Sequence, residues 1–311
     1  MASLTSAVAT GIKSVLITTD LSPASDKPLW HALSIARHYH AKLYLTHVVS
    51  SIGYAIVGPG ALQLASEATV REVQQLEQNW TESGLLKGLE HEFIVRQGDI
   101  WTQVRSVIEE KKVDLVIIGT HGRRSLGKVF LGSVAEQIFR RADAPVLTVG
   151  PGTAPNSPID NGGSLRPFVF GTDFGAASTK ALPMAVSFAN HFGARLVLLH
   201  VAPIAPIPER FHWSRTTMDV RKMQEEARRP ALKRLEEILS QCEAPILEPE
   251  FLVKFGTPSK MIVHVACSLG ADLIVMGLNH SRYLGTEAHM PGGTAYQVVC
   301  EAGCSVLTVR S

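Results

Sequence analysis

The sequence predicts an α/β protein in which one domain occurs twice, each copy having a parallel sheet covered by helices. The first observation is an internal repeat: Val15–Asp20 aligns with Phe168–Asp173, and Ala41–Val48 aligns with Ala194–Val201 at the same offset. The second is the alternation of short, β-branched apolar runs with segments of helical periodicity, which is typical of buried parallel strands joined by helices. A chain of 311 residues is long enough for two such domains.

The elements of the first copy follow from these patterns in order. An apolar run predicts a strand at about 13–19, and apolar residues at helical spacing predict a helix at about 26–39, capped by Ser25 or Asp26. The remaining elements are a strand at 42–48, a loop with Gly53, Gly58, Pro59 and Gly60, a helix at 62–82, a strand at 93–96, a helix from Trp101 to Ile108, a strand at 113–118, a glycine-rich loop at 119–133, a helix with Ile138 and Phe139, and a strand at 146–149.

The second copy repeats this order after a slightly longer middle, and Gly277 falls where the first copy has Gly119. Between the copies, residues 151–165 are polar and rich in proline and glycine, which predicts a linker. The predicted domains are therefore 1–150 and 166–311.

Composition limits the classes of function. A net charge of +2 argues against a nucleic-acid-binding surface. The apolar runs have the length of strands, so we expect no membrane span, and the N-terminus lacks the basic and apolar segments of a signal peptide. We therefore expect a cytoplasmic protein that binds neither nucleic acid nor membranes. Its four cysteines, all in the C-terminal half and without a CxxC pair, are expected to be buried, reduced thiols.

The glycine-rich loop is the strongest candidate for a binding site. It leaves the carboxyl end of a predicted strand and leads to a helix N-terminus, where open backbone N–H groups and the helix dipole favour an anion. Gly119 and Gly122 allow the backbone to turn and to approach a ligand, while Gly132 and Ser133 offer unobstructed amides. In open α/β sheets, ligands gather at this edge.

The spacing of the loop is Gly119, two residues, Gly122, nine residues, then Gly132-Ser133. It resembles the ATP-binding signature of the universal stress protein family, and the resemblance covers most of the chain, twice. It implies two tandem Rossmann-like (adenine nucleotide alpha hydrolase-like) domains, each an open five-stranded parallel sheet with helices on both faces and a nucleotide at the switch point. Related proteins often pair such domains through their last strands, so we expect an intrachain pseudo-dimer.

The resemblance also implies roles for residues at the strand ends. Asp20 would lie beside adenine or ribose, Val48 would offer backbone groups to adenine, and His121 would lie near the phosphates or ribose. Asp20 is also consistent with a turn or helix-capping residue, and His121 with an exposed loop residue without a role. The candidate nucleotide-binding residues are Thr18, Thr19, Asp20, Val48, Ile118, Gly119, Thr120, His121, Gly122, Arg123, Gly132, Ser133 and Val134.

Charge in the loop favours phosphate. Arg123, Arg124 and Lys128 add positive charge beside the amides, although a solvated basic turn has the same appearance. ATP would bring Mg²⁺ or Mn²⁺, held mainly by phosphates and water because the loop contributes no carboxylate. No protein metal site is predicted.

The loop is consistent with two other interpretations. Residues 122–129 nearly match a Walker A loop, but Val129 stands where a magnesium-binding Ser or Thr is needed. A glycine-rich strand-to-helix turn without a ligand is the plainer alternative.

The second copy departs from the ATP pattern, since His280 replaces the second glycine, two extra residues precede Gly292, and Gly293 replaces the serine. We therefore expect it to bind ATP weakly or not at all.

Three classes of function remain open. The first is a regulatory adenine-nucleotide-binding protein of the stress response, with an unidentified protein partner and a possible homodimer. The second is an ATP hydrolase, but no paired carboxylates and no nucleophile–base arrangement occur, so at most slow hydrolysis and no catalytic residue is expected. The third is a structural or partner-binding module without a nucleotide.

Overall fold

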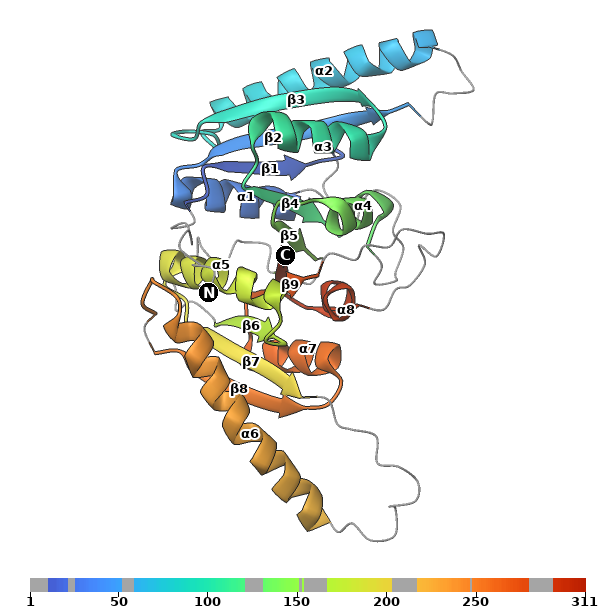
Figure 1. The fold of residues 1–311 in the computed structure, drawn as a ribbon. Coiled ribbons are helices and arrows are strands. Elements are labelled where there is room, and N and C mark those ends of the chain that lie inside the picture. The colour runs from blue at the N-terminus through green and yellow to red at the C-terminus, as the bar shows by residue number, and fades with distance from the viewer. Residues whose placement is uncertain are drawn as a thin grey trace. The chain divides into compact units, whose positions relative to one another are not determined.

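The computed structural model describes residues 11–21, 26–51, 59–120, 131–150, 153, 167–202, 217–246, 248–279 and 293–311 (Figure 1). The chain divides into two compact units, one of residues 11–162 and the other built from residues 163–311. Each unit is an α/β domain and is described by itself below.

The first domain alternates strands and helices along its described residues. The elements are β1 (Ser14–Thr18), α1 (Asp26–Tyr39), β2 (Lys42–Ser50), α2 (Pro59–Glu82), β3 (His91–Gly98), α3 (Ile100–Lys111), β4 (Leu115–Gly119), α4 (Ser133–Arg141) and β5 (Val146–Val149).

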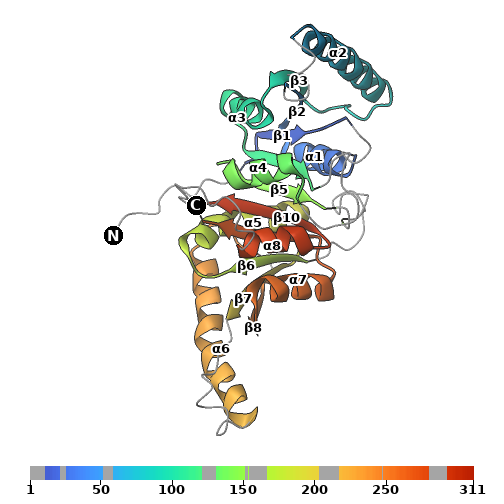
Figure 2. The same ribbon diagram turned by 90° about the vertical axis from the view of Figure 1, so that its right-hand side faces the viewer.

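The strands of the first domain pair in parallel, in the order β3-β2-β1-β4-β5. Helices α1 and α2 cover one face of this sheet, and α3 and α4 cover the other (Figure 2). From β1 the chain adds β2 and β3 on one side, and it then returns to place β4 on the other side of β1. Because each crossover is right-handed, this change of direction puts the later helices on the opposite face of the sheet. The strand order therefore reverses between β1 and β4, which makes their carboxyl ends the switch point of the sheet.

The second domain repeats this arrangement with parallel strands in the order β8-β7-β6-β9-β10. Helices α5 and α6 lie on one face, and α7 and α8 on the other (Figure 2). The elements are β6 (Phe168–Thr172), α5 (Ala176–Phe192), β7 (Leu196–Ala202), α6 (Thr217–Ser240), β8 (Glu250–Phe255), α7 (Pro258–Leu269), β9 (Leu273–Leu278), α8 (Thr294–Glu301) and β10 (Ser305–Arg310).

The duplication extends to single backbone conformations. Gly98 ends β3 with φ = 136°, and Gly256 follows β8 with φ = 145°. Only glycine adopts these angles readily, so both copies retain it at the turn into the next helix. The predicted α/β class with two tandem five-stranded domains is thus confirmed.

Element boundaries were predicted less well than the elements themselves. Helix α1 has its predicted bounds of 26–39, whereas β3 extends over His91–Gly98 rather than 93–96. The assignment of Pro59 and Gly60 to a loop was wrong, because α2 begins at Pro59. Proline suits a first helical position, where its missing N–H would have no helical partner.

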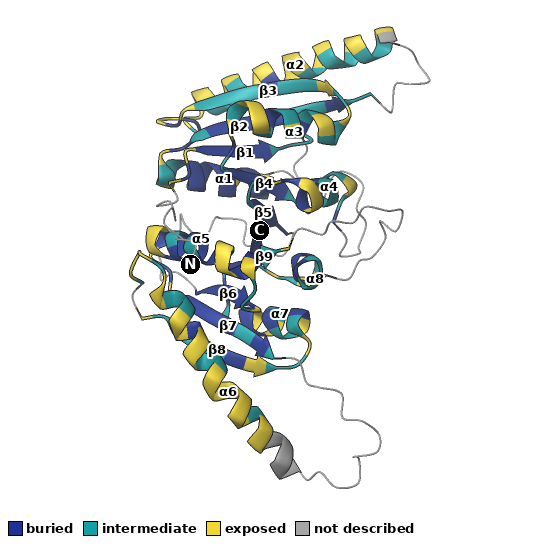
Figure 3. Ribbon diagram, viewed as in Figure 1, coloured by how far each residue is buried: buried dark blue, intermediate teal, exposed yellow. Residues whose placement is uncertain are grey.

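The cores consist of the central strands and the helix faces turned toward them (Figure 3). Leu16, Ile117 and Phe170 are completely buried, as the apolar runs predicted. The long helices α2 and α6 are mostly exposed and are held by few buried side chains, such as Val73 in α2 and Leu235 in α6. All four cysteines are free thiols, but the prediction that they are buried was wrong: Cys267 is exposed, and the other three are only partly buried.

Candidate functional site

The candidate site lies at the carboxyl ends of β1, β2 and β4 in the first domain. Strands β1 and β4 are direct neighbours, with Ile17 opposite Ile117. The chain positions that follow them, Asp20 after β1 and Thr120 after β4, therefore emerge at the same edge of the sheet. Their strands meet where the strand order reverses, which is the position favoured for a ligand in an open α/β sheet.

Thr19 is the best-anchored residue of this edge. Its N–H donates to the carbonyl of Thr46 at 3.0 Å, and its hydroxyl accepts the N–H of Leu21 at 3.0 Å. Its carbonyl lies 2.9 Å from Nδ1 of His47, which donates to it. Leu21 has φ = 58°, a left-handed conformation that costs energy for a leucine. Asp20 therefore lies between Thr19, which makes three hydrogen bonds, and Leu21, which has a left-handed backbone conformation.

The two ends of the glycine-rich loop are tied together. Thr120 donates its N–H to Val149 at 3.1 Å, and its carbonyl accepts the N–H of Gly132 at 2.9 Å. Thr120 itself is 5% exposed. The loop therefore leaves and returns to one place, directly beside the start of α4.

Helix α4 begins at this place, and its cap residue is a glycine, which has no side chain that could cap the helix. Gly132 is the residue before the first turn, and no side chain of the described residues accepts a hydrogen bond from the first-turn amides. Ser133 is exposed, Val134 is half-buried, and Ile138 farther along is completely buried, which anchors the helix on the sheet. The first-turn N–H groups and the positive end of the helix dipole can therefore receive an anion.

Neither its backbone angles nor its packing against the described residues requires Gly132 to be glycine. Its φ and ψ are −59° and 152°, which any residue can adopt. A Cβ there would come no closer than 3.5 Å to a described atom, the carbonyl oxygen of Thr120. In contrast, a Cβ on Gly277 would lie 2.2 Å from the backbone carbon of Ala177 and 2.3 Å from the backbone nitrogen of Ser178. Glycine at 277 is needed so that α5 can pack on β9, whereas glycine at 132 has no such role.

Two predicted side chains have different surroundings. Ile118 is 1% exposed, so it belongs to the core of the sheet, and its contact with a ligand remains a prediction. Val48 is half-buried near the end of β2. Val48 is four residues after Tyr44 in the same strand, so the two side chains are on the same face of the sheet. The Tyr44 ring lies 5.5 Å from Nζ of Lys111 in α3, so this is the face covered by α3 and α4.

The remaining candidate binding residues form two groups, one within the described residues and one outside them. Thr18 and Gly119 are the last residues of β1 and β4, half-buried at the shared edge. The predictions for His121, Gly122 and Arg123, together with Arg124 and Lys128, fall outside the described residues.

The corresponding edge of the second domain has the same turn but different details. Phe174 donates its N–H to the hydroxyl of Thr172 at 2.9 Å, and Asp173 accepts from the N–H of Gly175 and the hydroxyl of Ser178, both at 2.8 Å. Partial burial by itself would raise the pKa of Asp173, but these two hydrogen bonds hold that pKa below its ordinary value. Asp173 therefore stabilises the start of α5, which agrees with the capping alternative for this residue type.

The sequence interpretation missed the role of His47. Its counterpart His200 donates from Nδ1 to the carbonyl of Thr172, also at 2.9 Å. The two histidines align in the repeat, so their recurrence was visible in the sequence. The sequence could not show that each one reaches the end of the neighbouring strand.

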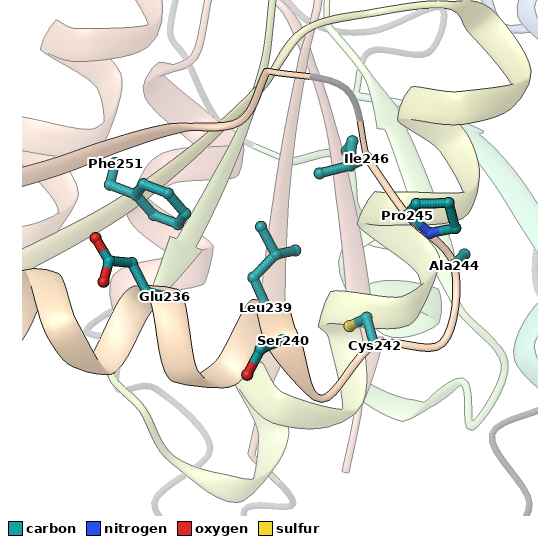
Figure 4. Close-up of a pocket in the computed structure, with 8 residues that line it drawn as sticks. All are labelled: Glu236, Leu239, Ser240, Cys242, Ala244, Pro245, Ile246 and Phe251. Carbon is teal, nitrogen blue, oxygen red and sulfur yellow. The ribbon is translucent and has the colours of Figure 1, made fainter.

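Other features of the described residues do not add to this site. None of their His, Cys, Asp and Glu side chains form a group of three or more that could hold a metal ion. No helix among them is long and apolar enough to cross a membrane. A cavity of about 320 Å³ lies in the second domain between α6 and the start of β8, and is lined by Leu239, Cys242 and Phe251 among others (Figure 4). Burial raises the pKa of the Cys242 thiol, so it is a weak nucleophile at neutral pH.

Comparison with known sequences identifies relatives of both halves. The profile described as "Universal stress protein family" matches residues 11–150 and again residues 164–310. A universal stress protein of Methanocaldococcus jannaschii is 30% identical over 138 residues, which are 44% of this chain and 81% of the relative. One from Mycobacterium tuberculosis is 25% identical over 210 residues, 67% of this chain and 66% of the relative.

Solved structures show the same fold over nearly the whole chain. A universal stress protein from Archaeoglobus fulgidus matches with a TM-score of 0.65 and 19% identity, covering 96% of both chains. A putative universal stress protein from Pseudomonas aeruginosa matches with a TM-score of 0.61 and 16% identity, covering 96% of this chain and 93% of the other. These likenesses agree with the tandem arrangement of two α/β domains.

Proposed function

The chain belongs to the universal stress protein family, and we propose that its first domain binds ATP where β1 and β4 end. The observation that carries this proposal is Gly132. It is the cap residue of α4 at the switch point of the sheet and has no side chain to cap the helix, and neither its backbone angles nor its described neighbours require glycine. Close approach of a phosphate to the helix N-terminus explains a residue without a Cβ at this position.

The rest of the site fits an adenine nucleotide in this orientation. The phosphates would lie against the amides of Gly132, Ser133 and Val134, and the nucleoside would lie toward Asp20 and Val48. Val48 and α4 are on the same face of the sheet, so one ligand can reach both. Mg²⁺ or Mn²⁺ would accompany the nucleotide, held mainly by phosphate oxygens and water.

The proposed role is regulatory. ATP binding would favour one conformation of the protein and so alter its contact with a partner, as any ligand with different affinities for two states does. Efficient hydrolysis is not proposed. Phosphate release under multiple turnover is the measurement for that point, and fast release would favour the enzyme alternative.

The second domain is proposed to bind ATP weakly or not at all. Helix α8 begins at Thr294. The residue before it, Gly293, is exposed and aligns with Ser133 of the first copy. The loop before α8 is longer than the loop before α4, so its amides need not present the same cradle.

Two measurements test the proposal. The protein is denatured and the released nucleotide is identified and counted, with about one ATP per chain expected. Calorimetry with Mg-ATP then compares wild type, Gly132→Ala and Gly293→Ala. We expect Gly132→Ala to weaken binding about tenfold or more, a loss of about 1.4 kcal/mol, without loss of stability.

Gly293→Ala is the matched control, because it changes the same kind of residue before α8, and a Cβ there would have no described atom within 4 Å. It should leave both affinity and stability unchanged. Absence of wild-type binding at millimolar Mg-ATP would overturn the proposal and favour a structural or partner-binding module.

A further inference from the structure

His47 is a polar side chain at the candidate edge to which neither the sequence pattern nor the proposed function gives a role. It lies near the end of β2, and its Nδ1 is 2.9 Å from the carbonyl oxygen of Thr19. Because that oxygen can only accept, Nδ1 carries the proton and donates. The hydrogen bond therefore crosses from β2 to the residue that follows β1 and immediately precedes Asp20.

The bond is part of a larger anchor. Thr19 donates its N–H to Thr46 on β2 and accepts the N–H of Leu21 with its hydroxyl, both at 3.0 Å. The peptide groups before and after Thr19 are thus both tied to β2, one through Thr46 and one through His47. The left-handed turn at Leu21, with φ = 58°, would be unfavourable without such an anchor.

The same arrangement occurs in the second domain. Nδ1 of His200 is 2.9 Å from the carbonyl of Thr172, and Phe174 has φ = 61° in the place of Leu21. There the turn places Asp173, whose carboxylate makes the two hydrogen bonds at the start of α5. The anchor is thus a device that aims the aspartate after the first strand of each domain.

His47 cannot do this by touching the ligand itself. His47 and Val48 are consecutive in a strand, so their side chains point to opposite faces of the sheet. Val48 is on the face of α3 and α4, where the nucleotide is proposed, and His47 is on the face of α1 and α2. Its effect on a ligand must pass through Thr19.

We propose that His47 is a positioning residue for nucleotide binding, which fixes the orientation of Asp20 by holding the Thr19 carbonyl. This inference rests on the proposed function of the first domain. In metal sites, removing a hydrogen bond that orients a ligating side chain weakens affinity about 10-fold or more. We expect an effect of that size on the dissociation constant for Mg-ATP.

The test compares His47→Asn with His47→Gln, two amides that differ in where the N–H is placed. The asparagine amide nitrogen occupies the position of Nδ1 and can donate to Thr19, whereas the longer glutamine places its nitrogen elsewhere. Calorimetry should show the affinity of His47→Asn close to that of wild type, and the affinity of His47→Gln about 10-fold lower. Thermal unfolding of both variants verifies that they are folded.

His200→Gln is the control, since it breaks the same hydrogen bond in the second domain. The His200 ring also lies 4.4 Å from the Phe174 ring, measured between centroids, so this variant should lose at least as much thermal stability as His47→Gln. It should leave ATP affinity unchanged. Wild-type affinity in His47→Gln, or equal weakening by His200→Gln, would overturn the positioning role. Failure of the wild type itself to bind ATP would instead overturn the proposed function, and this inference with it. The two failures are distinguishable because the wild type is measured first.

Discussion

The two domains share an anchored threonine–aspartate turn but differ at the glycine-rich edge beside it. In both, a histidine holds the turn from the neighbouring strand, with equal distances of 2.9 Å. Only the first has the predicted glycine and serine spacing before its last helix, whereas the second has a longer loop. The anchored turn is common to both copies, so it cannot by itself distinguish a domain that binds a nucleotide from one that does not. The glycine and serine spacing is confined to the first copy, so it is the feature that would make the difference.

The comparison also shows a difference in backbone strain. Helices α5 and α7 end in Gly193 and Gly270, with φ of 62° and 60°. At the equivalent positions after α1 and α3 the first domain has His40 and Lys112, with φ of 52° and 49°. Left-handed helix ends favour glycine, so the second domain is better optimised for stability at these turns.

The largest expected effect concerns the glycine that packs against a helix. Gly277→Ala would place a Cβ within 2.5 Å of three backbone atoms of α5, and backbone cannot move aside as a flexible side chain can. We expect the free energy of unfolding to fall by about 4 kcal/mol or more, measured by urea denaturation. Gly293→Ala, whose Cβ would have no described atom within 4 Å, serves as the control, and equal effects of the two substitutions would refute this account.

The next effect appears at alkaline pH. Burial, together with the Asp272 carboxylate and the Cys267 thiol, raises the pKa of Cys304 from 9.0 to about 12. The unfolded thiol ionises first, so stability is intact below pH 9 and falls as pH rises toward 12.

Cys304→Ala introduces the residue that the first domain has at this position, Ala144. It should remove roughly 2–3 kcal/mol of the stability loss between pH 9 and 11. Denaturation curves at several pH values measure this, and an unchanged pH dependence in the variant would contradict it.

A smaller effect occurs in acid. Because the pKa of Asp173 is lowered, its carboxylate contributes stability above pH 3.8, and this contribution is lost as pH falls below that value. Asp173→Asn should cost about 1 kcal/mol at pH 7 and progressively less in acid. ATP affinity should not change, whereas Asp20→Asn should weaken it. A loss of affinity in Asp173→Asn would show that the second domain also contributes to binding.

The smallest effect is a stabilisation. His40→Gly and Lys112→Gly give the first domain the helix ends of the second, and each should raise the free energy of unfolding by about 0.5–1 kcal/mol. The reverse change, Gly193→Ala, should lower it by a similar amount. Thermal unfolding of the three variants tests the sign, and destabilisation by His40→Gly would mean that its side chain makes a contact worth more than the strain.

Much of the fold could be predicted because it depends on local pattern. The repeat, the apolar runs of the strands and the periodicity of α1 were sufficient for the element order and for the placing of Asp20 and the glycine-rich loop at the same edge of the sheet. The start of α2 at Pro59 was missed because a proline signals both a loop and a first helical position. The reason for glycine at 277 was also out of reach, since it depends on how closely α5 approaches β9.

The sequence by itself determined that one α/β domain occurs twice and that a glycine-rich loop follows the fourth strand of the first copy. These are properties of residues near one another in the chain, where periodicity and spacing carry the information. Only the tertiary structure decided that His47 holds Thr19, that no described atom lies closer than 3.5 Å to the place of a Cβ on Gly132, and that Asp173 stabilises α5. Each of these depends on distances between segments that are adjacent only after folding, and sequence spacing does not encode such distances.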